Sequence, residues 1–116
     1  MLFVGALPAF AGTSWKPFST DLPRYQSWED LKSDRKINRS DAEAKISYIG
    51  SDYKANLRIQ DEGTKVSGTY KDIDEGETAT FTVDSSAVGN DVTLRGQTAN
   101  WTVVRVGMSG KFGADS

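Results

Sequence analysis

Beyond residue 41, apolar and polar residues alternate with a period of two over several short stretches of the chain. The clearest stretch is 53–60, in which every second side chain is apolar: Tyr53, Ala55, Leu57 and Ile59. In the stretch 77–83, threonines alternate with Ala79, Phe81 and Val83. A period of two places one face of a strand against a core and the other in water, which is typical of antiparallel sheets.

Turn-forming residues separate these stretches, because glycine recurs beside Asp, Asn, Ser, Glu or Gln at each boundary. The pattern predicts strands at 42–49, 53–60, 65–70, 77–83, 91–96 and 100–108, with a seventh short strand at 110–113. Short strands at this spacing predict an all-β fold. We expect a small antiparallel β-sandwich or barrel of about six to seven short strands.

The stretch 100–108 is the most apolar of the set, with Trp101, Val103, Val104, Val106 and Met108. Its alternation fails at the adjacent pair Val103 and Val104. This failure favours a strand that is covered on both faces, near the centre of a sheet. We therefore expect Leu57, Phe81 and Trp101 to be core residues on three different strands.

Residues 12–40 lack the alternation, which predicts an irregular N-terminal arm ahead of a β domain at 41–116. Apolar residues in the arm are spaced by three or four, but Pro17 and Pro23 would interrupt a long helix. Ser27 is a suitable helix N-cap and Asp30 follows three positions later. We predict one short helix at about 27–34.

Residues 1–11 have the pattern of the C-terminal part of a secretory signal peptide. An apolar run is followed by Ala9-Phe10-Ala11, so that Gly12 would follow the cleavage site. The basic residues that usually open such a signal are missing, since the first one is Lys16. A bilayer span needs about 20 apolar residues. We therefore expect no transmembrane segment and predict a secreted, extracellular protein.

Histidine and cysteine are both absent from the 116 residues. Their absence excludes thiol catalysis, cysteine zinc sites and Ser-His-Asp arrangements. The formal net charge is −2, with 14 basic and 16 acidic residues, so no basic excess indicates nucleic-acid binding. We expect a monomeric, non-enzymatic protein without a cofactor.

The segment 61–84 contains seven acidic residues, and Asp72-Ile73-Asp74-Glu75-Gly76 has the form D-x-D-x-G. Oxygen ligands at alternate positions of a bending loop can wrap calcium. The match to a helix-loop-helix calcium site fails, because Gly76 and Glu77 are out of place and Val83 stands where a bidentate Glu belongs. We favour a solvated hairpin turn and predict no metal site.

Aromatic and basic residues accompany each other in the arm. They are candidates for a surface that stacks on sugars or lies at a membrane interface: Trp15, Phe18, Tyr25, Trp28, Lys32, Arg35 and Lys36. The alternative is that these aromatics cover an open edge of the sandwich and complete its core, which is the commoner use of large apolar groups.

These observations predict a small secreted, non-enzymatic β-sandwich that acts by binding at the cell surface or in the extracellular medium. The partner would be a protein, a cell-envelope polymer or a membrane surface. A signal peptide followed by a cysteine-free β domain resembles the layout of many small exported proteins of Gram-positive bacteria. The alternative function is a secreted, bacteriocin-like toxin that acts on related bacteria.

Overall fold

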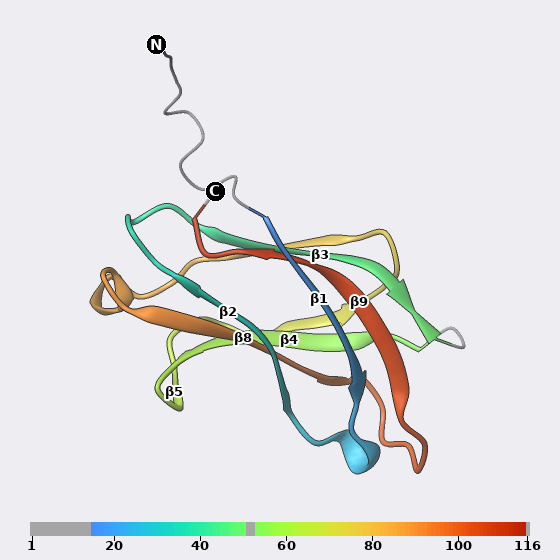
Figure 1. The fold of residues 1–116 in the computed structure, drawn as a ribbon. Coiled ribbons are helices and arrows are strands. Elements are labelled where there is room, and N and C mark those ends of the chain that lie inside the picture. Colours follow the sequence, from blue (N-terminus) through green and yellow to red (C-terminus); the bar gives the residue numbers. More distant parts are fainter. Residues whose placement is uncertain (1–14, 51–52, 116) are drawn as a thin grey trace.

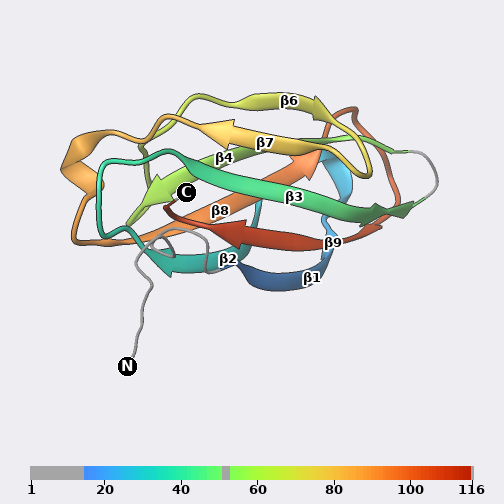
Figure 2. The same cartoon turned by 90° about the horizontal axis from the view of Figure 1, so that it is seen from above.

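Two antiparallel sheets pack face to face in the computed structural model, which describes residues 15–50 and 53–115 (Figures 1 and 2). The first sheet has the order β1 (Lys16–Leu22), β9 (Val106–Gly113), β3 (Ala42–Ile49) and β7 (Thr78–Phe81). The second has the order β2 (Glu29–Arg35), β8 (Asp91–Thr98), β4 (Ala55–Asp61) and β5 (Thr64–Lys65), and β6 (Tyr70–Ile73) also pairs with β4. Two 3-10 turns lie at Arg24–Gln26 and Ser85–Ala87.

The core lies between the sheets and is built from alternate residues of the central strands. In β8 the side chains of Val92, Leu94 and Thr98 are fully buried, and in β9 Met108 and Phe112 face them from the other sheet. Removing this apolar surface from water supplies the main driving force for folding, at about 25 cal/mol per Å².

The centre of the first sheet requires a glycine. A methyl group at Gly110 of β9 would overlap the carbonyl oxygen of Lys45 on β3. The ring of Phe18 on β1 closes the same space at 3.0 Å. Gly110 therefore lets three strands approach closely, and a side chain there would push them apart.

The predicted all-β sandwich is confirmed. Strand β3 has the predicted bounds, and β4, β7 and β8 lie where the alternation placed strands. Leu57 and Phe81 are buried as expected. The predicted strand 65–70 is divided between β5 and β6, because the chain crosses an isolated bridge at Ser67 instead of continuing in one ladder.

The predicted helix at 27–34 is wrong, because residues 29–35 form strand β2. This strand pairs with β8 from Glu29 to Arg35 with a register shift at Leu31, and the Leu31 side chain packs against the core. The segment before it forms β1, which pairs with β9. Hydrogen bonding to existing sheet edges outweighs the local preference for a helix, so this segment completes both sheets and is no irregular arm. The predicted cleavage site after Ala11 lies outside the described residues.

The predicted central strand at 100–108 is also wrong in its first half. Residues 101–105 form a loop, and β9 begins at Val106 and continues through Gly113, which includes the predicted seventh strand. Trp101 is 62% exposed instead of buried. The buried residues of β9 include Met108 and Phe112. This strand is continuous across residue 109, where the prediction separated two strands.

Candidate functional site

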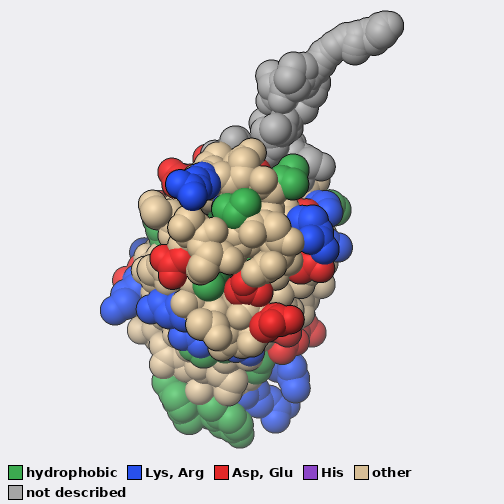
Figure 3. Space-filling model, turned by 90° about the vertical axis from the view of Figure 1, so that its left-hand side faces the viewer, with side chains coloured by type: hydrophobic (Ala, Val, Ile, Leu, Met, Phe, Trp, Pro, Cys, Tyr) green, Lys and Arg blue, Asp and Glu red, His purple; other side chains and the backbone are tan. Residues whose placement is uncertain are grey.

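A cluster of exposed apolar side chains lies at one end of the sandwich. Tyr25, Trp101, Val103 and Val104 are 57%, 62%, 57% and 46% exposed, and we call this cluster the apolar tip. They make up half of the eight large apolar side chains that are exposed in the described part of the chain. Figure 3 shows apolar side chains gathered at the lower end of the molecule. Exposed apolar groups that gather in one place mark interaction sites, whereas scattered ones do not.

Two loops form the tip, each of them connects one sheet to the other, and they are hydrogen-bonded to each other. The amide of Tyr25 donates a hydrogen bond to the carbonyl oxygen of Thr102 at 2.7 Å, and Gln26 Nε2 donates to the carbonyl oxygen of Ala99 at 2.6 Å. The rings of Tyr25 and Trp101 pack with centroids 5.6 Å apart. These contacts present the aromatic pair as one unit.

The 3-10 turn that carries Tyr25 is conformationally strained. Tyr25 and Gln26 have φ angles of 64° and 57°, in the left-handed region that favours glycine. Such residues cost about 1–3 kcal/mol each and persist where the surroundings hold them. The cross-loop hydrogen bonds hold this turn, in which the Tyr25 ring lies beside Trp101.

The tip is bordered by positive charge. Arg24 and Arg105 are both exposed and adjoin Tyr25 and Val104 in the chain. Basic side chains lie beside the apolar end in Figure 3. An aromatic and aliphatic surface with exposed arginines next to it in the chain is suited to non-covalent attachment to a surface that offers both apolar and anionic groups.

The structure does not bring the predicted binding residues to one surface. Trp15 is 37% exposed before β1, Phe18 is buried in the core, and Tyr25 belongs to the apolar tip. The remaining ones lie just before β2, along it and just after it: Trp28, Lys32, Arg35 and Lys36. For Phe18, the alternative that these aromatics complete the core is therefore confirmed.

Trp28 lies on the outer face of the second sheet, under an arginine. The guanidinium carbon of Arg58 is 4.0 Å from the centroid of the Trp28 ring. Arg95 lies directly opposite Arg58 in the ladder and forms an ion pair with Asp30 at 2.7 Å. Burial, and then repulsion from Arg95, lower the pKa of Arg58. These contacts give Trp28 a structural role on β4 and β8.

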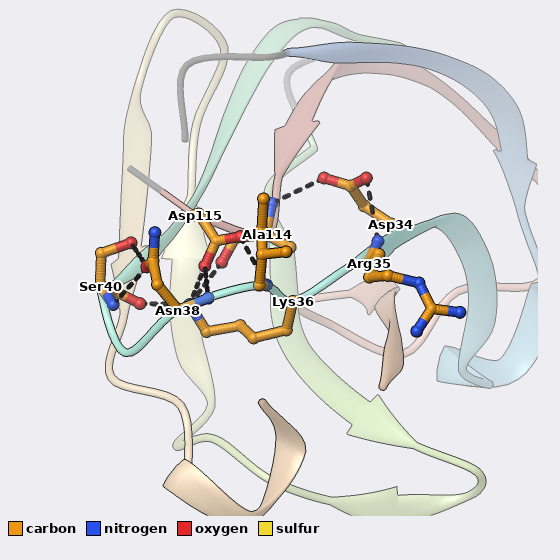
Figure 4. A network of polar contacts seen from close by, with 8 residues as sticks. Asp34, Arg35, Lys36, Asn38, Ser40, Ala114 and Asp115 are labelled. Atoms are coloured by element: carbon orange, nitrogen blue, oxygen red, sulfur yellow. Dashed lines mark hydrogen bonds and ion pairs between the residues drawn. The ribbon is translucent and has the colours of Figure 1, made fainter. Parts of the chain in front are cut away.

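Lys36 is fully buried, so the expectation that it contributes to a binding surface is wrong. Its ammonium group forms an ion pair with Asp115 at 2.6 Å and donates hydrogen bonds to the carbonyl oxygens of Ala114 and Ser40 (Figure 4). Three donors of the ammonium group meet three acceptors, which is how a buried charge becomes tolerable.

The partner carboxylate is equally well satisfied. Asp115 accepts hydrogen bonds from the amides of Ile37 at 2.9 Å and Asn38 at 3.3 Å, in addition to the one from Lys36. Burial alone would raise the pKa of Asp115, but these hydrogen bonds and the Lys36 charge together lower the pKa below its ordinary value. We call Lys36 and Asp115 the buried ion pair.

In the acidic turn at 74–77, carboxylates bind the backbone of the turn. Glu77 Oε1 accepts a hydrogen bond from the amide of Asp74, and Asp74 Oδ1 accepts one from the amide of Glu75, both at 2.8 Å. Gly76 has a φ of 86°, which the turn requires. Within residues 15–50 and 53–115, no group of three or more acidic side chains is placed to hold a metal ion.

Comparison with protein-family models, with curated proteins and with solved structures found no match to this chain. The described residues include no helix with the length and hydropathy needed to span a bilayer.

Sequence reasoning missed Trp101, Val103 and Val104 as surface residues. The signal was present in the failed alternation at Val103 and Val104, which fits a loop as well as a strand covered on both faces. The prediction ended one strand at 108 and began another at 110, whereas β9 is continuous through Gly107, Gly110 and Gly113.

Proposed function

We propose that this chain is a secreted, non-enzymatic binding protein and that the apolar tip attaches it to the interfacial region of a membrane. The observation that carries the proposal is the exposure of four apolar side chains in two bonded loops. A covering partner would remove this surface from water, and full burial of one Val-sized side chain contributes about 1.5–3 kcal/mol.

The kinds of residue in the tip favour a membrane interface. Tyrosine and tryptophan have apolar rings with one polar atom, and they gather at the boundary between headgroups and acyl chains. Arginine can keep its guanidinium at the phosphate level while its stem lies against apolar groups. Backbone in a loop cannot enter the hydrocarbon, because its amides would lose their hydrogen-bond partners. The expected insertion is therefore shallow.

Secretion and the lack of enzymatic activity remain parts of the proposal. The small residues at Ala9 and Ala11 support export. The absence of histidine and cysteine from the sequence supports a binding role, because the commonest general base and the thiol nucleophile are both missing.

The test is cosedimentation of the full chain with phospholipid vesicles. We expect wild type to bind and the double variant Trp101→Ala/Val104→Ser to lose most of its binding. Ile37→Ala is the matched control, because Ile37 is 64% exposed but lies beside the buried ion pair instead of in the tip. All variants retain residues 1–11, so any contribution of this apolar stretch to vesicle binding is the same in each. Equal binding by wild type and the double variant would refute the tip as the attachment site.

The alternative function, an antibacterial toxin, would use the same tip. A dye-release measurement distinguishes it from simple attachment. Attachment alone leaves vesicles sealed, whereas a membrane-active toxin releases an entrapped dye. We expect binding without release. Dye release that Trp101→Ala abolishes, together with inhibited growth of related bacteria, would favour the toxin.

A further inference from the structure

A shallow groove lies on the outer face of the first sheet, next to the apolar tip. It has a volume of about 340 Å³ and is lined by β1, β9 and β3, with Ser19, Asp21, Tyr48, Gly107 and Ser109 among its residues. Ligand pockets range from about 300 to 1,000 Å³, so this groove suits a small group.

Glycine forms the floor of the groove between a carboxylate and an aromatic ring. A methyl group at Gly107 would lie 3.6 Å from Asp21 Oδ1 and 3.8 Å from Tyr48 Cε2. Gly107 pairs with Asp21 across the β1–β9 ladder. The point above Gly107 is therefore open, and an atom placed there would contact both side chains at van der Waals distance.

The two side chains are available to a ligand. Asp21 is exposed and Tyr48 is 53% exposed. Within residues 15–50 and 53–115, neither the Asp21 carboxylate nor the Tyr48 hydroxyl has a hydrogen-bond or ion-pair partner. An unpaired carboxylate attracts an ammonium ion by charge, and a neighbouring aromatic ring adds a cation–π contact when the ion lies over its face.

We propose that this groove binds the ammonium group of a zwitterionic phospholipid headgroup, choline or ethanolamine. The assignment of this ammonium group to a membrane lipid rests on the proposed function, because the groove adjoins the tip. Asp21 precedes Arg24 by three residues, and Gly107 follows Arg105 by two. At about 3.3 Å per residue the groove begins within roughly 10 Å of the tip, which is the level of the headgroups when apolar side chains insert by about 5–10 Å.

The charges around the groove and the tip are complementary to those of a zwitterionic headgroup. Arg24 and Arg105 are placed beside the tip to meet a phosphate, while Asp21 meets the ammonium group. A purely anionic headgroup would satisfy the arginines but would be repelled by Asp21. The hydroxyls of Ser19 and Ser109 line the groove too, so a neutral sugar is the competing ligand and is included in the test.

The soluble test is a titration of phosphocholine into the full chain, followed by the NMR shifts of the Gly107 and Asp21 amides. Gly107→Ala fills the floor and Asp21→Asn removes the charge, and each should weaken binding by roughly tenfold or more. Gly68→Ala is the control, because a methyl group there meets no atom within 4 Å. Gly107→Ala also meets only ordinary contacts, so an unchanged or higher melting temperature verifies its fold.

Three outcomes would overturn the ammonium assignment: binding of glycerol phosphate or glucose as tight as that of phosphocholine, no binding of phosphocholine, or equal binding by wild type and Gly107→Ala. Cosedimentation with phosphatidylcholine and phosphatidylglycerol vesicles tests the lipid source, and we expect Gly107→Ala to weaken binding to phosphatidylcholine alone. Tip-dependent vesicle binding with no response to phosphocholine would leave the proposed function standing and refute the groove. Phosphocholine binding without vesicle binding would refute the membrane as the source.

Discussion

The two ends of the sandwich break the usual distribution of side chains in opposite ways. At one end, the apolar tip exposes Trp101 and Tyr25 to water. At the other, Lys36 and Asp115 are buried with their charges. Figures 1 and 2 place the tip loops and the end of β9 that leads to Asp115 at opposite ends of the sheets.

The two ends differ in whether contacts within the molecule offset the free-energy cost of the buried charges or of the exposed apolar surface. Every hydrogen-bonding group of the buried ion pair finds a partner on the same chain, so the charges need nothing else. The rings of Tyr25 and Trp101 contact each other, but more than half of each remains exposed. Buried charges that are fully hydrogen-bonded within the chain indicate a structural role. Apolar rings that stay exposed indicate a surface for a partner.

The largest expected effect comes from breaking the buried ion pair. Lys36→Ala leaves the carboxylate of Asp115 without its counter-ion in a buried site, which should cost about 3–5 kcal/mol of unfolding free energy. Urea denaturation measures this loss. Lys45→Ala, at an exposed lysine on β3, should stay within about 0.5 kcal/mol of wild type. Equal urea midpoints for the two variants would show that the buried ion pair does not contribute to the free energy of unfolding.

Acid should weaken the same end of the molecule. Because folding lowers the pKa of Asp115, the contribution of this carboxylate is complete above its unfolded pKa of about 3.9 and is lost as the pH falls through the folded value. Asp115→Asn should therefore be less stable than wild type at pH 7, and the difference should shrink below about pH 4. A difference that stays constant from pH 7 to pH 2.5 would contradict this linkage.

At the other end, a large deletion should leave stability almost unchanged. Trp101→Ala removes a side chain that is 62% exposed, so the free energy of unfolding should change by no more than about 0.5 kcal/mol. Phe81→Ala, at an aromatic residue that is 3% exposed, should cost about 3–5 kcal/mol. Thermal and urea denaturation compare the two. A Trp101→Ala loss as large as that of Phe81→Ala would mean that the tip is part of the core.

The smallest expected effect concerns the acidic turn. Its carboxylates already accept backbone hydrogen bonds from Asp74 and Glu75, so calcium should not stabilise the fold. A site with free ion at 100 times its dissociation constant would add about 2.7 kcal/mol. We expect the same melting temperature in millimolar calcium and in chelator. A rise that Asp72→Asn/Asp74→Asn abolishes would establish a metal site instead.

The period-two pattern was enough to predict much of the fold. Strand β3 followed from the alternation alone, because its apolar residues Ala42, Ala44 and Ile46 all face the core. Strand β2 could not be predicted in this way. Its polar residues form a strand because β8 offers an unpaired edge, and that edge exists only in the assembled sheet.

The site was less predictable than the fold. Of the seven residues proposed from the sequence, Tyr25 lies in the apolar tip, while Phe18 and Lys36 are buried. Composition in one segment was a poor guide, because the tip combines Tyr25 with residues more than 70 positions away. Their proximity depends on the pairing of β1 with β9.

The sequence by itself determined the class of fold, since alternating apolar residues and glycine-rich turns have few other compact solutions. It also determined the chemistry that is missing, through its lack of histidine and cysteine. Tertiary structure decided which side chains are covered. Lys36 meets Asp115 across 79 positions, and Trp101 finds no covering strand. Burial depends on what packs against a residue, so it cannot be predicted from residue type alone.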